Sequence, residues 1–222
     1  MAQGVGNRIS GTNTIRFIAA DNIPNNKIVT YGRLVSDLKP HKTEEQRVRL
    51  TVGGDRIDCP YDISILVDDL ATIKIHLNNV ISTHKSEFFC TDIRNFYLNN
   101  DLPSPEYTRL PIAIIPEEII AEYNLLPLVK NEFVYILIQK GMYSLPQAGK
   151  LANDELIKHL APFGYQPTTH TPGLWRHKTR NISFVLTVDD FGINYTKTRD
   201  ATHLLNALRT KYELSTDWTG SL

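Results

Sequence analysis

One stretch, Ile182–Tyr195, constrains the fold more than any other part of the sequence. It consists of an apolar run, two adjacent aspartates at Asp189 and Asp190, and a second apolar run with Gly192 near its start. Both flanks are rich in β-branched and aromatic residues, which favour extended strands. The stretch therefore predicts an antiparallel hairpin that carries Asp189 and Asp190 at its tip.

The acidic pair at this tip has two interpretations. Two neighbouring carboxylates repel each other, and a bound divalent cation relieves that repulsion. Aspartate is also a favoured turn residue, which needs no ligand to explain it. Acidic doublets recur elsewhere in the chain, at Glu44–Glu45, Asp68–Asp69 and Glu117–Glu118. The acidic pair alone does not distinguish metal binding from an ordinary turn, so the question is whether another segment supplies a further ligand.

Composition places the chain among ordinary globular proteins. With 222 residues, 41% of them hydrophobic and 22% charged, it is long enough for one large domain or two small lobes. Lysine and arginine total 24, as do aspartate and glutamate, so a nucleic-acid surface would have to arise from local clustering.

The sequence also predicts the cellular location of the protein. Cys59 and Cys90 each lie in or beside an apolar segment, which favours reduced thiols over a disulfide. No apolar run approaches the ~18 residues of a membrane span, and the first residues lack the apolar core of a secretory signal. We therefore predict a soluble intracellular protein, located in the cytoplasm and without a membrane partner.

The N-terminal third reads as a tail followed by strands. Residues 1–13 are polar and glycine-bearing, which predicts a flexible tail. Residues 14–20 predict a strand. The runs 28–35 and 47–52 predict a hairpin, because a polar, charged segment separates them.

The second strand of that hairpin has a basic face. Val48, Leu50 and Val52 alternate with Arg47 and Arg49, so the two arginines share one side. Together with Lys42 on the charged tip, this face can bind phosphates. The alternative is a solvated edge strand that charge protects from aggregation.

A helix is predicted from about residue 64 to residue 84. Apolar residues recur along one side of it at steps of three and four. They are Leu66, Leu70, Ile73, Leu77, Val80 and Ile81. Asp68 and Asp69 fall in its first turns, where acidic groups suit the helix dipole, so we do not assign this doublet to a metal.

Two further segments carry candidate site residues. The short apolar run 87–93 places Asp92 at a strand end, where it is either a partner for the acidic pair or an ordinary turn or capping residue. The segment Leu145-Pro-Gln-Ala-Gly149 opens a helix, with Ser144 as candidate N-cap and with Pro162 and Gly164 as its stop. Gln147 lies in the first turn, where free backbone N–H groups can face a ligand. A last amphipathic helix is predicted over 200–213.

These motifs occur together in one order: the strand ending in Asp92, the Leu-Pro-Gln-Ala-Gly helix start and the Val-Asp-Asp hairpin. In that order the sequence, from about residue 28 to residue 220, resembles the reverse transcriptase (RNA-directed DNA polymerase) domain of LTR retrotransposons of the copia-like type. The resemblance implies an α+β fold with the fingers and palm of a polymerase right hand. The palm would be an antiparallel sheet packed on helices.

The resemblance also implies a division of the chain. Fingers and palm would occupy residues 14–222, the fingers mainly 14–85 and part of 100–145. The palm would be mainly 86–99 and 146–222. Because the chain stops at Leu222, the thumb is expected to be absent.

The resemblance implies that Asp92, Asp189 and Asp190 are the catalytic carboxylates and bind two Mg²⁺ ions, for which Mn²⁺ can substitute. The reaction would add dNTPs to a primer 3′-hydroxyl by two-metal-ion phosphoryl transfer. The partners would be an RNA or DNA template with its primer, dNTPs, and other parts of a polyprotein such as RNase H and integrase. Virus-like particles in the cytoplasm would be a further location.

Four residues acquire nucleotide-binding roles from the same resemblance. Tyr97, five positions after Asp92, matches the aromatic residue that excludes a ribose 2′-hydroxyl. Gln147 matches the residue that contacts the incoming nucleotide and template. Arg49 and Lys42 match the fingers residues that hold the triphosphate.

Two departures keep other hypotheses open. Thr187 stands two positions before Asp189, where many relatives have tyrosine, and this alters the expected primer contact. The second departure is the expected absence of the thumb. A polymerase without its thumb holds duplex weakly because it makes fewer phosphate contacts. One alternative is therefore a truncated, inactive remnant that folds as fingers and palm and at most binds nucleic acid. Another is an α/β protein of unrelated function in which all three aspartates are turn residues.

Overall fold

The computed structural model describes residues 13–38, 46–59, 63, 69–171 and 173–219. The fold is α+β, as predicted from the sequence. Contacts divide the chain into two compact units. Unit 1 comprises Met1–Ile63 and Tyr97–Ala152, and unit 2 comprises Ser64–Phe96 and Asn153–Leu222. No helix in the described ranges combines the length and the apolarity that crossing a membrane requires.

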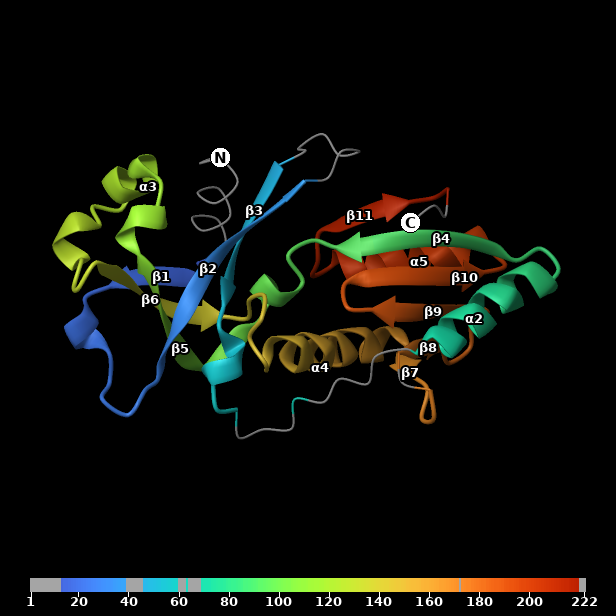
Figure 1. The fold of residues 1–222 in the computed structure, drawn as a ribbon. Helices are drawn as coiled ribbons and strands as arrows, with labels where there is room; N and C mark the ends of the chain where they lie inside the picture. The colour runs from blue at the N-terminus through green and yellow to red at the C-terminus, as the bar shows by residue number, and fades with distance from the viewer. Residues whose placement is uncertain (1–12, 39–45, 60–62, 64–68, 172, 220–222) are drawn as a thin grey trace. The chain divides into compact units, whose positions relative to one another are not determined.

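Unit 1 is built on a five-stranded sheet with the order β1-β6-β5-β2-β3 (Figure 1). Its strands are β1 Ile15–Ile18, β2 Val29–Leu38, β3 Gln46–Val52, β5 Asp101–Pro111 and β6 Phe133–Lys140. Neighbours are antiparallel except β2 and β5, which run parallel. The unit also holds α3 Glu117–Glu122 and the short 3₁₀ turns η1 Ala20–Asn22, η2 Gly54–Arg56, η3 Tyr97–Asn99, η4 Ile112–Ile114 and η5 Leu126–Leu128.

The predicted hairpin in the N-terminal third is confirmed. Strands β2 and β3 pair antiparallel, with Gly32 opposite Val52 and Val35 opposite Arg49. Leu50 and Val52 pack against the core of unit 1, so Arg49 lies on the opposite side of the strand, as the alternation indicates. Residues 39–45 of the charged tip, including Lys42, and all of the predicted tail except residue 13 lie outside the described residues.

Unit 2 is built on a six-stranded, wholly antiparallel sheet with the order β11-β4-β10-β9-β8-β7 (Figure 1). Its strands are β4 Glu87–Ile93, β7 Tyr165–Pro167, β8 Leu174–His177, β9 Ile182–Thr187, β10 Asp190–Tyr195 and β11 Leu214–Asp217. The predicted hairpin around the acidic pair is confirmed as β9 and β10. The two outermost strands, β7 and β11, are short and were not predicted.

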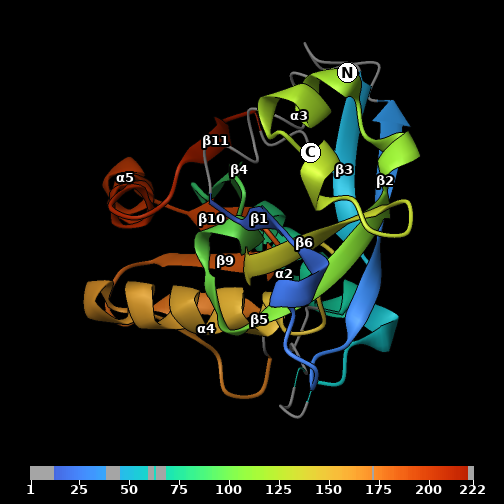
Figure 2. The same ribbon diagram turned by 90° about the vertical axis from the view of Figure 1, so that its left-hand side faces the viewer.

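Helices cover both faces of the central strands of unit 2. The helix α2 Leu70–Ser82 lies on one face, while α5 Thr198–Arg209 and the C-terminal part of α4 Ala148–Leu160 lie on the other (Figures 1 and 2). In β10, every residue from Phe191 to Tyr195 is buried, which is the pattern of a strand covered on both sides. The strand that carries Asp190 is therefore fixed in the core of the unit.

The helix predicted from residue 64 has a different start and a different buried face. The first turn begins at Leu70, and Asp69 is its N-cap because the Asp69 carboxylate accepts a hydrogen bond of 2.6 Å from the Thr72 backbone N–H. Residues 64–68 lie outside the described residues. The apolar stripe is not the buried side of the helix: Leu70, Leu77 and Ile81 are 65%, 40% and 84% exposed, while Ile73 and Val80 are half-buried. The buried residue is His76, whose ring has a hydrogen-bond partner beneath the helix.

The helix that follows Gln147 begins later than its capping residue predicted. Helix α4 starts at Ala148, and Ser144 is an exposed residue with a left-handed backbone (φ 72°), so it is not the N-cap. The predicted stop is confirmed: Pro162 lies in the 3₁₀ turn η6 Ala161–Phe163, and Gly164 caps it with φ 89°. The apolar face of α5 is also confirmed. Ala201, Leu204, Leu205 and Leu208 are all buried. The helix ends at Arg209, earlier than the predicted residue 213, and Tyr212 is buried in the segment that follows it.

Candidate metal centre

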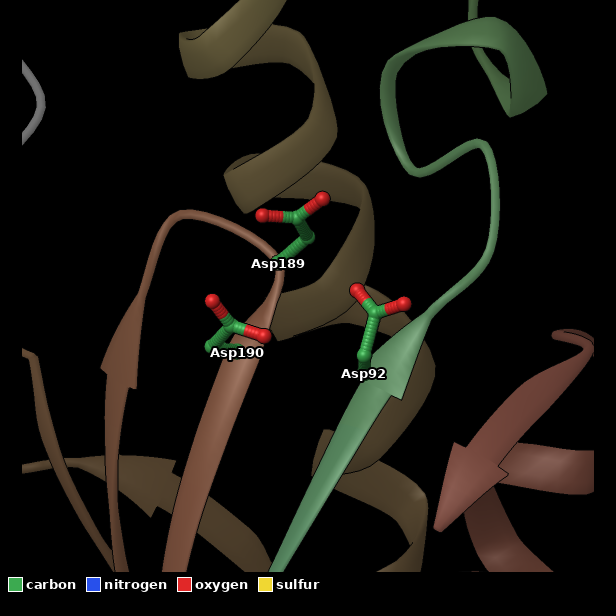
Figure 3. A group of neighbouring side chains, drawn as sticks. All are labelled: Asp92, Asp189 and Asp190. Carbon is green, nitrogen blue, oxygen red and sulfur yellow. The ribbon is translucent and has the colours of Figure 1, made fainter. Parts of the chain in front are cut away.

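Three carboxylates converge at one end of the unit 2 sheet. Asp92 is the penultimate residue of β4, and Asp190 is the first residue of β10. The two residues lie directly opposite each other in the β4–β10 ladder, so their side chains leave the same face of the sheet. Asp189 stands in the adjoining turn, and one oxygen of each of the three carboxylates lies within 4.8 Å of the other two (Figure 3).

The turn that carries Asp189 is tight. Thr187 ends β9 and pairs with Asp190, so Val188 and Asp189 form a two-residue loop, one position earlier than the predicted tip. Such hairpin turns need a positive φ at their first position, and Val188 has φ 63°. A β-branched residue is strained there and persists only where its surroundings hold it. One such support is the Ile93 backbone N–H, which donates to the Asp189 carbonyl at 3.1 Å.

The charge of this cluster determines what it can bind. Two unit charges 4.8 Å apart repel by about 3 kcal/mol at an effective dielectric constant of about 20, and by about 1 kcal/mol in bulk water. Asp92 and Asp189 are half-buried, so part of this repulsion remains unscreened. A divalent cation would remove it. All the side-chain donors are carboxylate oxygens, the set that suits Mg²⁺ or Mn²⁺ rather than Zn²⁺ or a soft metal.

Contacts behind the carboxylates hold their strands in register. The His76 Nε2 atom of α2 lies 3.1 Å from the Gly192 carbonyl, so the neutral ring donates to β10. On the other side of β4, the Thr91 hydroxyl donates to the Ser215 carbonyl of β11 at 3.1 Å. Nothing in the sequence spacing of His76 identifies it as the residue that connects α2 to β10, the strand that carries Asp190.

Burial of histidines makes the stability of unit 2 depend on pH. The pKa values of His76, His177 and His203 lie below the ordinary 6.5, in each case mainly because burial disfavours the charged ring. Below about pH 6.5 the unfolded chain therefore binds more protons at these histidines than the folded chain does. The contribution of the three neutral rings to the free energy of unfolding is complete above this pH and decreases as the pH falls below it.

We therefore expect the urea midpoint of unfolding to be lower at about pH 5 than at about pH 7.5. The variant His76→Gln keeps a donor for the Gly192 carbonyl but cannot titrate, so its midpoint should change less between the two pH values. Equal pH dependence in the wild type and in His76→Gln would contradict the role given to His76.

The residues with predicted nucleotide-binding roles lie in unit 1. Arg49 on β3 places its guanidinium 5.1 Å from the ring centroid of Tyr143, a cation–π contact. The ring of Tyr143 meets the ring of Tyr97 edge-on at 5.5 Å. The Arg49 Nε atom is buried and has no hydrogen-bond partner among the described residues. Tyr143 therefore connects two of the predicted residues, although the sequence did not single it out.

Gln147 lies immediately before α4 and is buried, with 9% of its surface exposed. Its Nε2 atom donates a hydrogen bond of 3.1 Å to Glu106 Oε1 on β5. Burial raises the pKa of the Glu106 carboxyl, while Lys27 and the Gln147 hydrogen bond act in the opposite direction. The sequence did not single out Glu106 either, but a signal was present, because Glu106 stands two and four positions before Thr108 and Leu110 and so shares a face of β5 with these buried residues.

The structure thus brings Asp92, Asp189 and Asp190 together in unit 2. Within unit 1 it connects Arg49 to Tyr97 through Tyr143 and pairs Gln147 with Glu106. A search against models of known protein families finds no match for this chain.

Proposed function

We propose that the chain is the catalytic part of an RNA-directed DNA polymerase of the reverse transcriptase type. The observation that carries the proposal is the convergence of Asp92 with Asp189 and Asp190. About a hundred residues separate Asp92 from the other two in the sequence. The sequence motifs require these carboxylates to meet, and independent turn residues would have no reason to do so.

In this proposal unit 1 corresponds to the fingers and unit 2 to the palm. The six-stranded antiparallel sheet with helices on both faces is the architecture expected of a palm. Helix α2 then belongs to the palm, since His76 bonds to β10, whereas the sequence placed residues up to 85 mainly with the fingers.

The residues would divide the work as follows. Mg²⁺ bound by Asp92, Asp189 and Asp190 would supply activation of the primer 3′-hydroxyl and stabilisation of charge on the transferred phosphoryl group. Strands β4 and β10 fix two of the carboxylates opposite each other, and the hydrogen bond from Ile93 fixes the turn that carries Asp189.

The described nucleotide-binding candidates supply contacts of matching chemistry. The guanidinium of Arg49 suits the triphosphate, for which a planar cation with several donors is the usual partner. The ring of Tyr97 would exclude a ribose 2′-hydroxyl, and Gln147 would contact the nucleotide. Template, primer and dNTPs are the proposed ligands, with RNase H and integrase as proposed neighbours in a polyprotein.

The test is primer extension on poly(rA)/oligo(dT) with dTTP and Mg²⁺. We expect Mg²⁺-dependent incorporation of dTMP that EDTA abolishes and Mn²⁺ restores. Binding of the primer–template in low salt without incorporation at any Mg²⁺ or Mn²⁺ concentration would overturn the proposal. That outcome would favour the nucleic-acid-binding remnant instead.

A further inference from the structure

Glu106 is placed unusually for a charged residue. It lies on β5 and shares a strand face with Thr108 and Leu110, which are 0% and 4% exposed. The chain therefore directs a carboxylate toward the interior of unit 1, where an unpaired charge would be costly. There the carboxylate accepts a hydrogen bond from the side-chain amide of Gln147.

The pairing fixes which end of the Gln147 amide points away from Glu106. An ionised carboxylate can only accept hydrogen bonds, so it must meet the NH₂ group of the amide and not the carbonyl. The 3.1 Å contact joins Gln147 Nε2 to Glu106 Oε1 accordingly. The other end, Gln147 Oε1, is buried and has no hydrogen-bond partner among the residues that the structure describes.

A buried acceptor without a partner is unfavourable because it has lost its hydrogen bonds to water. Rotating the amide by half a turn would direct Oε1 at the Glu106 carboxylate, where two acceptors would repel each other. A hydrogen bond to a charged acceptor is roughly twice as strong as a neutral one, so Glu106 holds the amide in one orientation. The site thereby keeps an oriented acceptor that a ligand donor can satisfy.

We propose that Glu106 is a positioning residue, which orients the Gln147 carboxamide so that Oε1 accepts a hydrogen bond from a hydroxyl or amino group of the incoming nucleotide. The inference rests on the proposed function for its ligand class. The pairing itself rests only on contacts within unit 1. If Glu106 served only to join β5 to the segment before α4, its removal would lower stability and leave nucleotide affinity unchanged.

The experiment measures the side-chain amide signals of Gln147 in ¹H–¹⁵N spectra of the full chain during a titration with dTTP and Mg²⁺. Glu106→Gln keeps the size of the side chain but can present either an acceptor or a donor to Gln147, so it loses control of the orientation. Glu118→Gln, the same substitution at an exposed residue of α3, is the matched control.

We expect dTTP to shift the Gln147 amide signals in the wild type and in Glu118→Gln. In Glu106→Gln the dissociation constant for dTTP should rise about tenfold, the effect of one lost hydrogen bond. In primer extension the same variant should raise KM for dTTP about tenfold and leave kcat within about threefold, the signature of lost ground-state binding.

Unchanged dTTP affinity in folded Glu106→Gln would overturn the inference. So would wild-type Gln147 signals that dTTP does not move, a result that stands even if the variant does not fold. The outcome is separable from the proposed function. If the chain fails to extend primers but dTTP shifts the Gln147 signals in a way that depends on Glu106, the role of Glu106 is supported and the proposed polymerase activity is rejected.

Discussion

Replacing Asp189 with asparagine is expected to lower the rate of Mg²⁺-dependent primer extension by at least about 10³-fold. The substitution keeps the shape of the side chain and removes one of the three negative charges that lie within 4.8 Å of one another. An amide binds a divalent cation more weakly than a carboxylate does. The backbone carbonyl of Asp189, which accepts from the Ile93 N–H, is unchanged, so the turn should keep its place.

Stability should respond in the opposite direction, which separates folding from catalysis. Without metal, Asp189→Asn removes like-charge repulsion, so the free energy of unfolding should stay equal or rise by about 1 kcal/mol. With Mg²⁺ the wild type should gain stability and the variant should gain less. The measurements are incorporation of dTMP and urea unfolding in EDTA and in Mg²⁺, with exposed Asp101→Asn as the control. Equal incorporation by wild type and Asp189→Asn would show that the carboxylates are not catalytic.

Strand patterns that were local and apolar predicted their elements well. The hairpin of β9 and β10 was predictable because both of its strands are long apolar runs joined by acidic residues. Strands β7 and β11 have three and four residues and are largely polar. Such short edge strands form because a neighbour offers unpaired backbone groups, a cause that lies elsewhere in the chain.

Helix α2 shows a limit of periodicity. Its apolar residues recur at helical spacing, yet Leu77 and Ile81 are exposed and His76 is buried. Spacing locates an apolar stripe on a helix, but the neighbouring surface decides which side is covered. Here the Gly192 carbonyl of β10 gives the His76 ring a hydrogen-bond partner, and the side of the helix that carries His76 is the covered one.

In the candidate site, too, some residues could be predicted from the sequence and others could not. Asp92, Asp189 and Asp190 could be grouped in advance because an ordered set of motifs implied that their strands meet. Tyr143 and Glu106 could not, since each acts through a contact with a residue distant in sequence, Arg49 and Gln147 respectively. Long-range pairing between side chains leaves little trace in local sequence.

The second large effect is expected at Gly54, where alanine should lower the free energy of unfolding by about 3 kcal/mol or more. A Cβ atom at Gly54 would lie 1.9 Å from the backbone carbonyl oxygen of Ser144, far inside van der Waals contact. A flexible side chain could rotate away from such a clash, but a main-chain carbonyl cannot. Ser144 already has a left-handed backbone, so the segment has little freedom to adjust.

The damage should extend from stability to nucleotide binding, because Ser144 lies between Tyr143 and Gln147. A shift of this segment would disturb the contact of Tyr143 with Arg49 and the hydrogen bond of Gln147 to Glu106. Urea unfolding and dTTP titration should therefore both change in Gly54→Ala. In the control Asp58→Ala, at an exposed neighbouring position, neither should change. Wild-type stability in Gly54→Ala would mean that the loop after β3 does not pack closely on the Ser144 carbonyl, and the arrangement of Arg49, Tyr143 and Gln147 would then need another support.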